Sequence, residues 1–130
     1  MSINDLGKEG ERQARLIAKM WGVEKIFQPD WITMKNGAWY VWEVKHKSMF
    51  KAPPFDGHGL NAYQADMRIE FYQKFGMRCL FFVIDKDTGK IYWAWLDELE
   101  QGRKFETRNH VRIYPLENFH EIKNPLLNQK

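Results

Sequence analysis

The chain has 130 residues, of which 44% are hydrophobic and 28% are charged, and its formal net charge is +3. This length fits one domain with a sizeable core, and the composition excludes a disordered chain. No apolar run reaches the roughly 20 residues that span a bilayer, and the polar start MSINDLGKEGERQ has no signal segment, so we expect a cytoplasmic protein without a membrane partner. The single cysteine, Cys79, excludes a disulfide within the chain, and the mild basic charge favours nucleic acid as a partner.

The first predicted element is a helix over residues 6–21, in which small and apolar residues recur at helical spacing on one face. The stretch VEKIFQ that follows is typical of a short strand. Residues 30–35 and 38–46 are predicted to form two further strands. Asn36-Gly37 between them is the strongest short-range signal for a hairpin with a two-residue turn.

After the hairpin, the Pro- and Gly-rich stretch SMFKAPPFDGHG is predicted to be a loop. A second helix is expected over residues 60–75, and the apolar stretches RCLFFVID and KIYWAWL are predicted strands. Beyond residue 96, the sequence favours a strand at HVRIYP and a short helix at LENFHEI.

Helices and strands in this order, αβββαββ, predict an α/β fold in which a central mixed β-sheet is flanked by helices. No internal repeat or linker divides the chain. We therefore expect a single domain over residues 1–130, with a core from about residue 6 to residue 96 and a C-terminal extension over residues 97–130.

The hairpin brings two acids and one base together at its open end. With a two-residue loop at the other end, Asp30 faces Glu43 across the strands, and directly opposed Cβ atoms lie about 4.5–5.5 Å apart. Side chains alternate between the two faces of a strand, so Lys45 lies on the same side as Glu43. The turn therefore predicts a patch of two carboxylates and one ammonium group.

Two facing carboxylates repel each other and destabilise a sheet unless a positive charge compensates them. A hard divalent cation such as Mg²⁺ binds carboxylate oxygens, and it can also bind a phosphate oxygen and activate a water molecule. Lys45 is then placed to orient that water or to offset charge on the phosphorus oxygens. The predicted chemistry is hydrolysis of a phosphodiester bond. The alternative is a salt-bridge cluster at a strand end, but the half-buried apolar residues around Glu43 favour a site.

Pro-Asp30, twelve intervening residues and then Glu43-Val44-Lys45 resemble the signature of the PD-(D/E)XK nuclease superfamily. Over most of its length the chain is most similar to the archaeal-type Holliday junction resolvases. The resemblance implies a restriction-endonuclease-like core and a prokaryotic or phage-like endonuclease of DNA recombination or repair, with Mg²⁺ as cofactor and Mn²⁺ as a substitute. It implies that Asp30, Glu43 and the backbone carbonyl of Val44 bind the metal, and that Lys45 is catalytic.

The resemblance extends to two further positions. Glu11 stands in a G-x-x-x-E-R setting in the first helix, which implies that it supports the metal site. Its alternative role is a favourable anion near the helix start, in competition with Glu9. Gln64 lies on an apolar stripe of the second helix, where a buried amide needs a partner such as the catalytic site. Its alternative role is that of the N3 residue in a capping box, with Asn61 as the N-cap.

Basic residues around the predicted site are candidates for contacts with the DNA backbone. They are Lys8, Arg12, Arg15 and Lys19 on the outer face of the first helix, then Lys47, Lys51 and His58 in or beside the following loop, with a second cluster at Arg103, Lys104, Arg108 and Arg112. Phosphate contacts position a backbone without reading its sequence, so we expect structure-directed or weakly sequence-specific cleavage.

The principal alternative to an enzyme is a non-catalytic nucleic-acid-binding relative of the same fold. The choice between DNA and RNA stays open, as does the number of metal ions. A junction-cleaving enzyme needs two active sites and hence a homodimer, whereas a nickase does not. The compact segment IFQPD stands where those resolvases carry a longer basic segment, so junction specificity is not implied.

Overall fold

The structure is a computed structural model that describes residues 3–123. Its helices are α1 (Ile3–Met20), α2 (Ala62–Phe75), α3 (Leu96–Gln101) and the 3-10 helix η1 (Leu116–Asn118). Its strands are β1 (Trp31–Lys35), β2 (Ala38–Lys47), β3 (Phe50–Ala52), β4 (Phe55–Asn61), β5 (Arg78–Asp85), β6 (Ile91–Trp95), β7 (Phe105–Glu106), β8 (Val111–Pro115) and β9 (His120–Ile122). Residues 124–130, the end of the expected C-terminal extension, lie outside the described residues.

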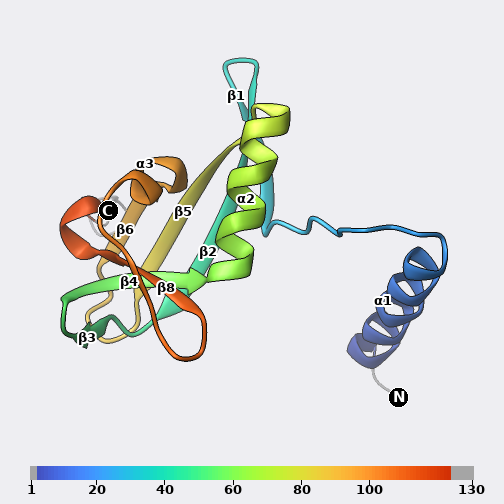
Figure 1. The fold of residues 1–130 in the computed structure, drawn as a ribbon, viewed down its shortest axis with the longest axis horizontal. Helices are drawn as coiled ribbons and strands as arrows, with labels where there is room; N and C mark the ends of the chain where they lie inside the picture. Colours follow the sequence, from blue (N-terminus) through green and yellow to red (C-terminus); the bar gives the residue numbers. More distant parts are fainter. Residues whose placement is uncertain (1–2, 124–130) are drawn as a thin grey trace, which may run out of the picture.

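The strands form a larger and a smaller sheet. The larger sheet has the order β1-β2-β5-β6-β9 and is mixed, because β2 and β5 run parallel while the other neighbours run antiparallel. α2 lies in the crossover between β2 and β5 (Figure 1). The smaller sheet, β3-β4-β8-β7, is antiparallel throughout. The predicted α/β class with a central mixed sheet and flanking helices is confirmed, and the smaller sheet was not predicted.

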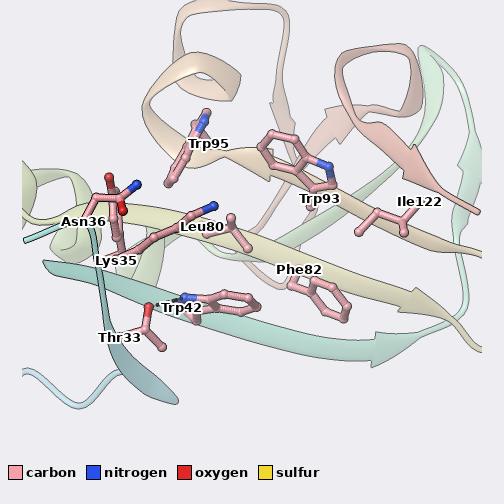
Figure 2. Close-up of a pocket in the computed structure, with 10 residues that line it drawn as sticks. Thr33, Lys35, Asn36, Trp42, Leu80, Phe82, Trp93, Trp95 and Ile122 are labelled. Carbon is pink, nitrogen blue, oxygen red and sulfur yellow. Dashed lines mark hydrogen bonds between the residues drawn. The ribbon is translucent and has the colours of Figure 1, made fainter. Parts of the chain in front are cut away.

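The two faces of the larger sheet differ in what covers them. Val41, Phe81 and Val83 point to the covered face, where they are buried in the core with residues of α2 and α3. Leu80 and Phe82 alternate with them and point to the opposite face, which no described helix covers. We call this second surface the open face; it holds a cavity of about 500 Å³ lined chiefly by Tyr40, Trp42, Leu80, Phe82, Trp93, Trp95 and Ile122 (Figure 2).

α1 stands apart from the sheets and is joined to β1 by an extended segment (Figure 1). Its end matches the prediction, because Gly22 takes the left-handed φ of 82° that terminates a helix. The strand predicted at VEKIFQ is wrong. The side chains of this segment contact α2 instead: Lys25 Nζ lies 2.6 Å from a Glu70 oxygen, and the Phe27 ring stacks on a phenylalanine ring of α2.

The loop predicted at SMFKAPPFDGHG is also wrong, since most of it forms the hairpin of β3 and β4. The glycines serve close strand packing there. A Cβ atom on Gly57 would lie 1.9 Å from the Tyr114 carbonyl oxygen, and one on Gly59 would lie 2.0 Å from the Arg112 carbonyl oxygen. Glycine at these two positions therefore allows β4 to pair with β8, whereas sequence reasoning took it as a sign of a flexible loop.

The later elements agree with the sequence in part. The predicted strands at RCLFFVID, KIYWAWL and HVRIYP are β5, β6 and β8, and the second helix begins two residues later than expected. LENFHEI was predicted to be a helix, but it forms η1 and then β9, which extends the larger sheet. α3 was not predicted, because six residues are too few for a helical period to stand out.

Within residues 3–123, no helix has the length and apolarity needed to cross a membrane.

Candidate active site

The predicted hairpin register is confirmed over five pairs, from Lys35 with Ala38 to Trp31 with Trp42. The ladder ends there, and two other hydrogen bonds replace the expected pairing of Asp30 with Glu43. The Asp30 N–H donates to the Trp42 carbonyl oxygen at 3.2 Å. The Val44 N–H donates to Asp30 Oδ2 at 2.8 Å. The Asp30 carboxylate is thereby fixed to the backbone of the residue that follows Glu43.

Glu43 is buried on the covered face of the sheet, with 2% of its surface exposed. Arg68 of α2 neutralises it: its Nε donates to Glu43 Oε1 at 2.7 Å, and one terminal nitrogen lies 2.5 Å from the same oxygen. Burial raises the pKa of Glu43, and the charge and hydrogen bonds of Arg68 offset part of that rise. A carboxylate in this position needs a cation, which the structure supplies from the neighbouring helix.

Lys45 lies on the same side of β2 as Glu43, as the alternation of a strand requires. Its Nζ is 3.9 Å from Glu43 Oε2, and its side chain is 22% exposed. Glu43 and Lys45 are therefore neighbours on one side of β2, and the Asp30 carboxylate is bound to the backbone N–H of the residue between them.

The donor set of this group fits a hard divalent cation. Asp30 Oδ1 and Glu43 Oε2 accept no hydrogen bond from the residues that the structure describes, so two carboxylate oxygens are available. No cluster of three or more His, Cys, Asp or Glu side chains within residues 3–123 is arranged to hold a metal. A cation here would thus have few protein ligands and keep several waters, as Mg²⁺ prefers.

Arg68 is the site residue that sequence reasoning missed. The buried side of α2 runs through Ala62, Ala65 and Arg68, whereas Gln64 is only half-buried and makes no hydrogen bond with a described residue. The apolar stripe assigned to Gln64 was therefore set at the wrong angle around the helix. Asn61 is the N-cap, as the alternative proposed, and its side chain accepts from the Tyr63 N–H at 2.9 Å. A glutamate among the apolar residues of an interior strand was the signal that a neighbouring element had to supply a cation.

Glu11 is not brought to the two carboxylates. It lies on α1, half exposed, with its Oε1 3.1 Å from an Arg15 nitrogen and 3.1 Å from Gln28 Nε2. The connection to the site is indirect, because the Gln28 carbonyl oxygen in turn accepts from Arg68 at 3.1 Å. Its support of a metal site stays a prediction.

The basic residues predicted to contact DNA are spread over separate parts of the molecule. Lys8, Arg12 and Arg15 are exposed on α1, where Arg12 pairs with Glu9 at 2.6 Å. Lys47 ends β2 and Lys51 lies on β3, both exposed. In the second predicted cluster, Arg112 is largely buried and bound to three acids, Asp66, Glu100 and Glu106. Its role in the structure is therefore to join α2, α3 and the smaller sheet.

His58 does not lie in a surface loop, and that part of the prediction is wrong. It is 2% exposed on β4, with its ring beside Tyr92 and Phe119. Its Nε2 has no hydrogen-bond partner and lies 3.9 Å from Asp85 Oδ2. Burial lowers the pKa of His58 despite this carboxylate, so the ring is neutral near pH 7. A histidine held in the core does not reach a DNA backbone.

No family model and no curated protein matches the chain. Among solved structures, the chain is similar to Hjc, a Holliday junction resolvase from the archaeal hyperthermophile Archaeoglobus fulgidus. The two chains share 15% sequence identity, the match covers 78% of this chain and 84% of that chain, and the TM-score is 0.45.

Proposed function

We propose that the protein is a metal-dependent endonuclease that hydrolyses phosphodiester bonds in DNA, with Mg²⁺ as the metal and Mn²⁺ as a substitute. One observation supports this proposal: Glu43 is almost fully buried with Lys45 beside it, and the Asp30 carboxylate is bound to the backbone N–H of Val44 between them. Arg68 offsets the cost of burying Glu43, but it contacts only Oε1, so Glu43 Oε2 and Asp30 Oδ1 accept no hydrogen bond from a described residue. A hard divalent cation would bind these two oxygens.

Each residue has a role that follows from its place. Asp30 and Glu43 hold the metal, with the Val44 carbonyl as a further ligand. The bound metal would activate water and stabilise charge on the phosphate. Lys45 is more exposed than Glu43, so its ammonium group is placed to contact the attacking water or the phosphate oxygens. Glu11 is proposed to support this centre only indirectly, through Gln28 and Arg68, and Gln64 is proposed as a supporting residue from its half-buried place on α2.

The substrate contacts proposed for Lys47, Lys51, Lys8, Arg12 and Arg15 are contacts with phosphates. The sequence has no pattern of a recognition helix or zinc finger that would contact base edges, so the cleavage is proposed to be weakly specific or directed by DNA structure, as in recombination or repair. Paired cuts across a branched substrate would require two copies of this domain, in a homodimer.

A second candidate is a non-catalytic nucleic-acid-binding protein of the same fold. The contact that favours it is the one between Arg68 and Glu43, because a guanidinium already compensates the buried carboxylate. In that case, no metal is needed to stabilise Glu43.

Incubation with branched, duplex and single-stranded DNA, in Mg²⁺, Mn²⁺ or EDTA, separates the two candidates. If the protein is a nuclease, at least one of these DNAs should be cleaved in either metal and none in EDTA. RNA of the same sequences is included for comparison. Binding of these substrates without metal-dependent cleavage would instead establish the non-catalytic protein.

A further inference from the structure

A groove on the smaller sheet lies directly beyond the end of β2. It encloses about 370 Å³ and is lined chiefly by Lys47, Ser48, Phe50, Thr107, Asn109 and Ile113. These residues come from the end of β2, the β3–β4 hairpin, the turn at residues 107–110 and β8. The volume is in the range of pockets that bind small organic groups.

The shape of the groove depends on two glycines of β4. Gly57 pairs with Phe50 on β3, and Gly59 pairs with Ile113 on β8, so these four residues lie on one face of the smaller sheet. β4 therefore places no side chain of its own between the Phe50 ring and β8. A Cβ atom on Gly59 would lie 2.9 Å from the Ile113 side chain, so a larger residue there would displace this wall of the groove.

Polar groups border the apolar walls. Lys47 is the one side chain of the described lining that is charged near pH 7. Asn109 is exposed, and its amide makes no hydrogen bond with a described residue. The Thr107 hydroxyl accepts from the Val111 N–H at 3.2 Å and keeps its own proton to donate. An aromatic wall, polar edge groups and one cation match the base, the base edge and the phosphate of a nucleotide.

The groove continues the line of the candidate active site along β2. Glu43, Lys45 and Lys47 lie on one side of this strand, and Lys47 is about 13 Å beyond Glu43 at the usual rise of a strand. Neighbouring nucleotides of a stacked DNA strand are about 3.4 Å apart, so this distance corresponds to about four nucleotides. Partial burial lowers the pKa of Lys47, and the charge of Lys45 lowers it further. Phosphates beside the two lysines would offset their repulsion.

We infer that the groove binds one unpaired base of the DNA strand, about four nucleotides from the bond held at the candidate active site. The base stacks on Phe50, its edge hydrogen-bonds with Asn109 and Thr107, and its phosphate contacts Lys47. Bases inside a duplex are stacked on both faces, so only an unpaired base can present a face to the Phe50 ring. The preferred substrate class is thus DNA with a single-stranded segment beside a duplex. The distance to the cut rests on the proposed nuclease function, whereas binding of the base does not.

The test is the affinity for a fluorescent DNA duplex that carries a single-stranded tail, measured in EDTA to prevent cleavage. A matched duplex carries an abasic tail, in which the phosphates remain and the bases are absent. The wild type should bind the normal tail about 10-fold more tightly than the abasic tail, because stacking of one base on an aromatic ring typically contributes that much. Equal affinities for the two tails would overturn the inference, since the phosphates alone would then explain the binding.

Two variants assign this preference to the groove. Phe50→Ala removes the stacking wall and should bind the normal and abasic tails almost alike. Asn109→Ala, at an exposed position, should weaken the preference, and it decides the question if circular dichroism shows that Phe50→Ala is unfolded. Phe75→Ala, at the exposed end of α2, is the matched control and should keep the full preference. An unchanged preference in Phe50→Ala, or in Asn109→Ala where the first variant is unfolded, would contradict the groove as the binding site.

Cleavage in Mg²⁺ separates this inference from the nuclease proposal. A preference for the normal tail without cleavage of any DNA would support the groove and contradict the nuclease. Equal cleavage of blunt and tailed duplexes without that preference would do the reverse. Where both hold, cuts in tailed DNA should lie within about four nucleotides of the end of the duplex. Cuts spread evenly along the DNA would contradict the position of the groove relative to the cut.

Discussion

Arg68 on α2 and Glu43 on β2 form an ion pair in which both side chains are almost fully buried, with Arg68 Nε 2.7 Å from Glu43 Oε1. The guanidinium also lies 4.5 Å from the centre of the Phe27 ring and donates to the Gln28 carbonyl oxygen. One arginine thus fixes the candidate catalytic strand, the crossover helix and the segment that leads into Asp30.

Removal of the Arg68 charge should destabilise the fold. Arg68→Met leaves the Glu43 carboxylate buried without its cation, which typically costs about 3–5 kcal/mol in the free energy of unfolding. Adding Glu43→Gln to it should recover most of the loss, because no buried charge remains. Urea unfolding of the three proteins measures this, with Lys74→Met on the exposed side of α2 as the control. A loss of under about 1 kcal/mol, typical of a surface pair, would contradict the buried pair.

Asp30→Asn should abolish cleavage and leave the fold intact. The amide oxygen can still accept the hydrogen bond from Val44, but it is no longer an anionic ligand for a hard cation. Calorimetry should show weaker Mg²⁺ binding, and thermal unfolding without metal should be close to that of the wild type. Asp56→Asn, at an exposed position of β4, is the matched control and should cleave normally. Full activity of Asp30→Asn would rule out this residue as a metal ligand.

Lys45→Ala separates catalysis from substrate binding. The two carboxylates remain, so the metal should still bind, and the affinity for DNA should fall only modestly because one phosphate contact among several is lost. Single-turnover cleavage should fall by about 10²–10³, the usual effect of removing one donor that acts on the transition state. Lys90→Ala, in the exposed turn before β6, is the control for loss of a positive charge. If binding and cleavage fall by the same factor in one buffer, Lys45 only binds the substrate.

His58 should make the fold sensitive to mild acid. Its pKa in the folded state is lowered by burial, so below about pH 6.5 the unfolded chain binds a proton that the folded chain does not. The free energy of unfolding should therefore fall with decreasing pH, by at most about 1.4 kcal/mol per pH unit from this group. The nearby Asp85 weakens the effect and Lys47 strengthens it.

The measurement compares urea unfolding at about pH 7.5 and pH 5.5. His58→Gln should reduce the difference between the two pH values, whereas His46→Gln, at an exposed position, should leave it unchanged. An equal pH dependence in the wild type and His58→Gln would mean that His58 titrates alike in the folded and unfolded chain.

The sequence by itself determined what depends on local geometry. A two-residue Asn36-Gly37 turn allows one register, so the five pairs of the hairpin follow from the sequence alone. The alternation of side chains along β2 then puts Glu43 and Lys45 on one side, wherever the strand lies in the fold. The apolar stretches of β5 and β6 likewise predict strands from the sequence alone, because buried strands are continuous runs of apolar residues.

Tertiary structure decided everything that depends on which segments meet. Gly57 and Gly59 favour a loop when the sequence is considered alone. Their actual role is close packing of β4 against β8, and such contact between distant segments leaves no local pattern in the sequence. The cation that pairs with Glu43 comes from α2, which is distant in sequence from β2. Gln64 and Arg68 lie close together around α2, so a small error in the predicted helical face selects Gln64 in place of Arg68. The burial of His58 and the separation of α1 from the sheets could not be predicted for the same reason. Whether a residue is buried depends on how the layers assemble, and the periodicity of a single segment does not predict that.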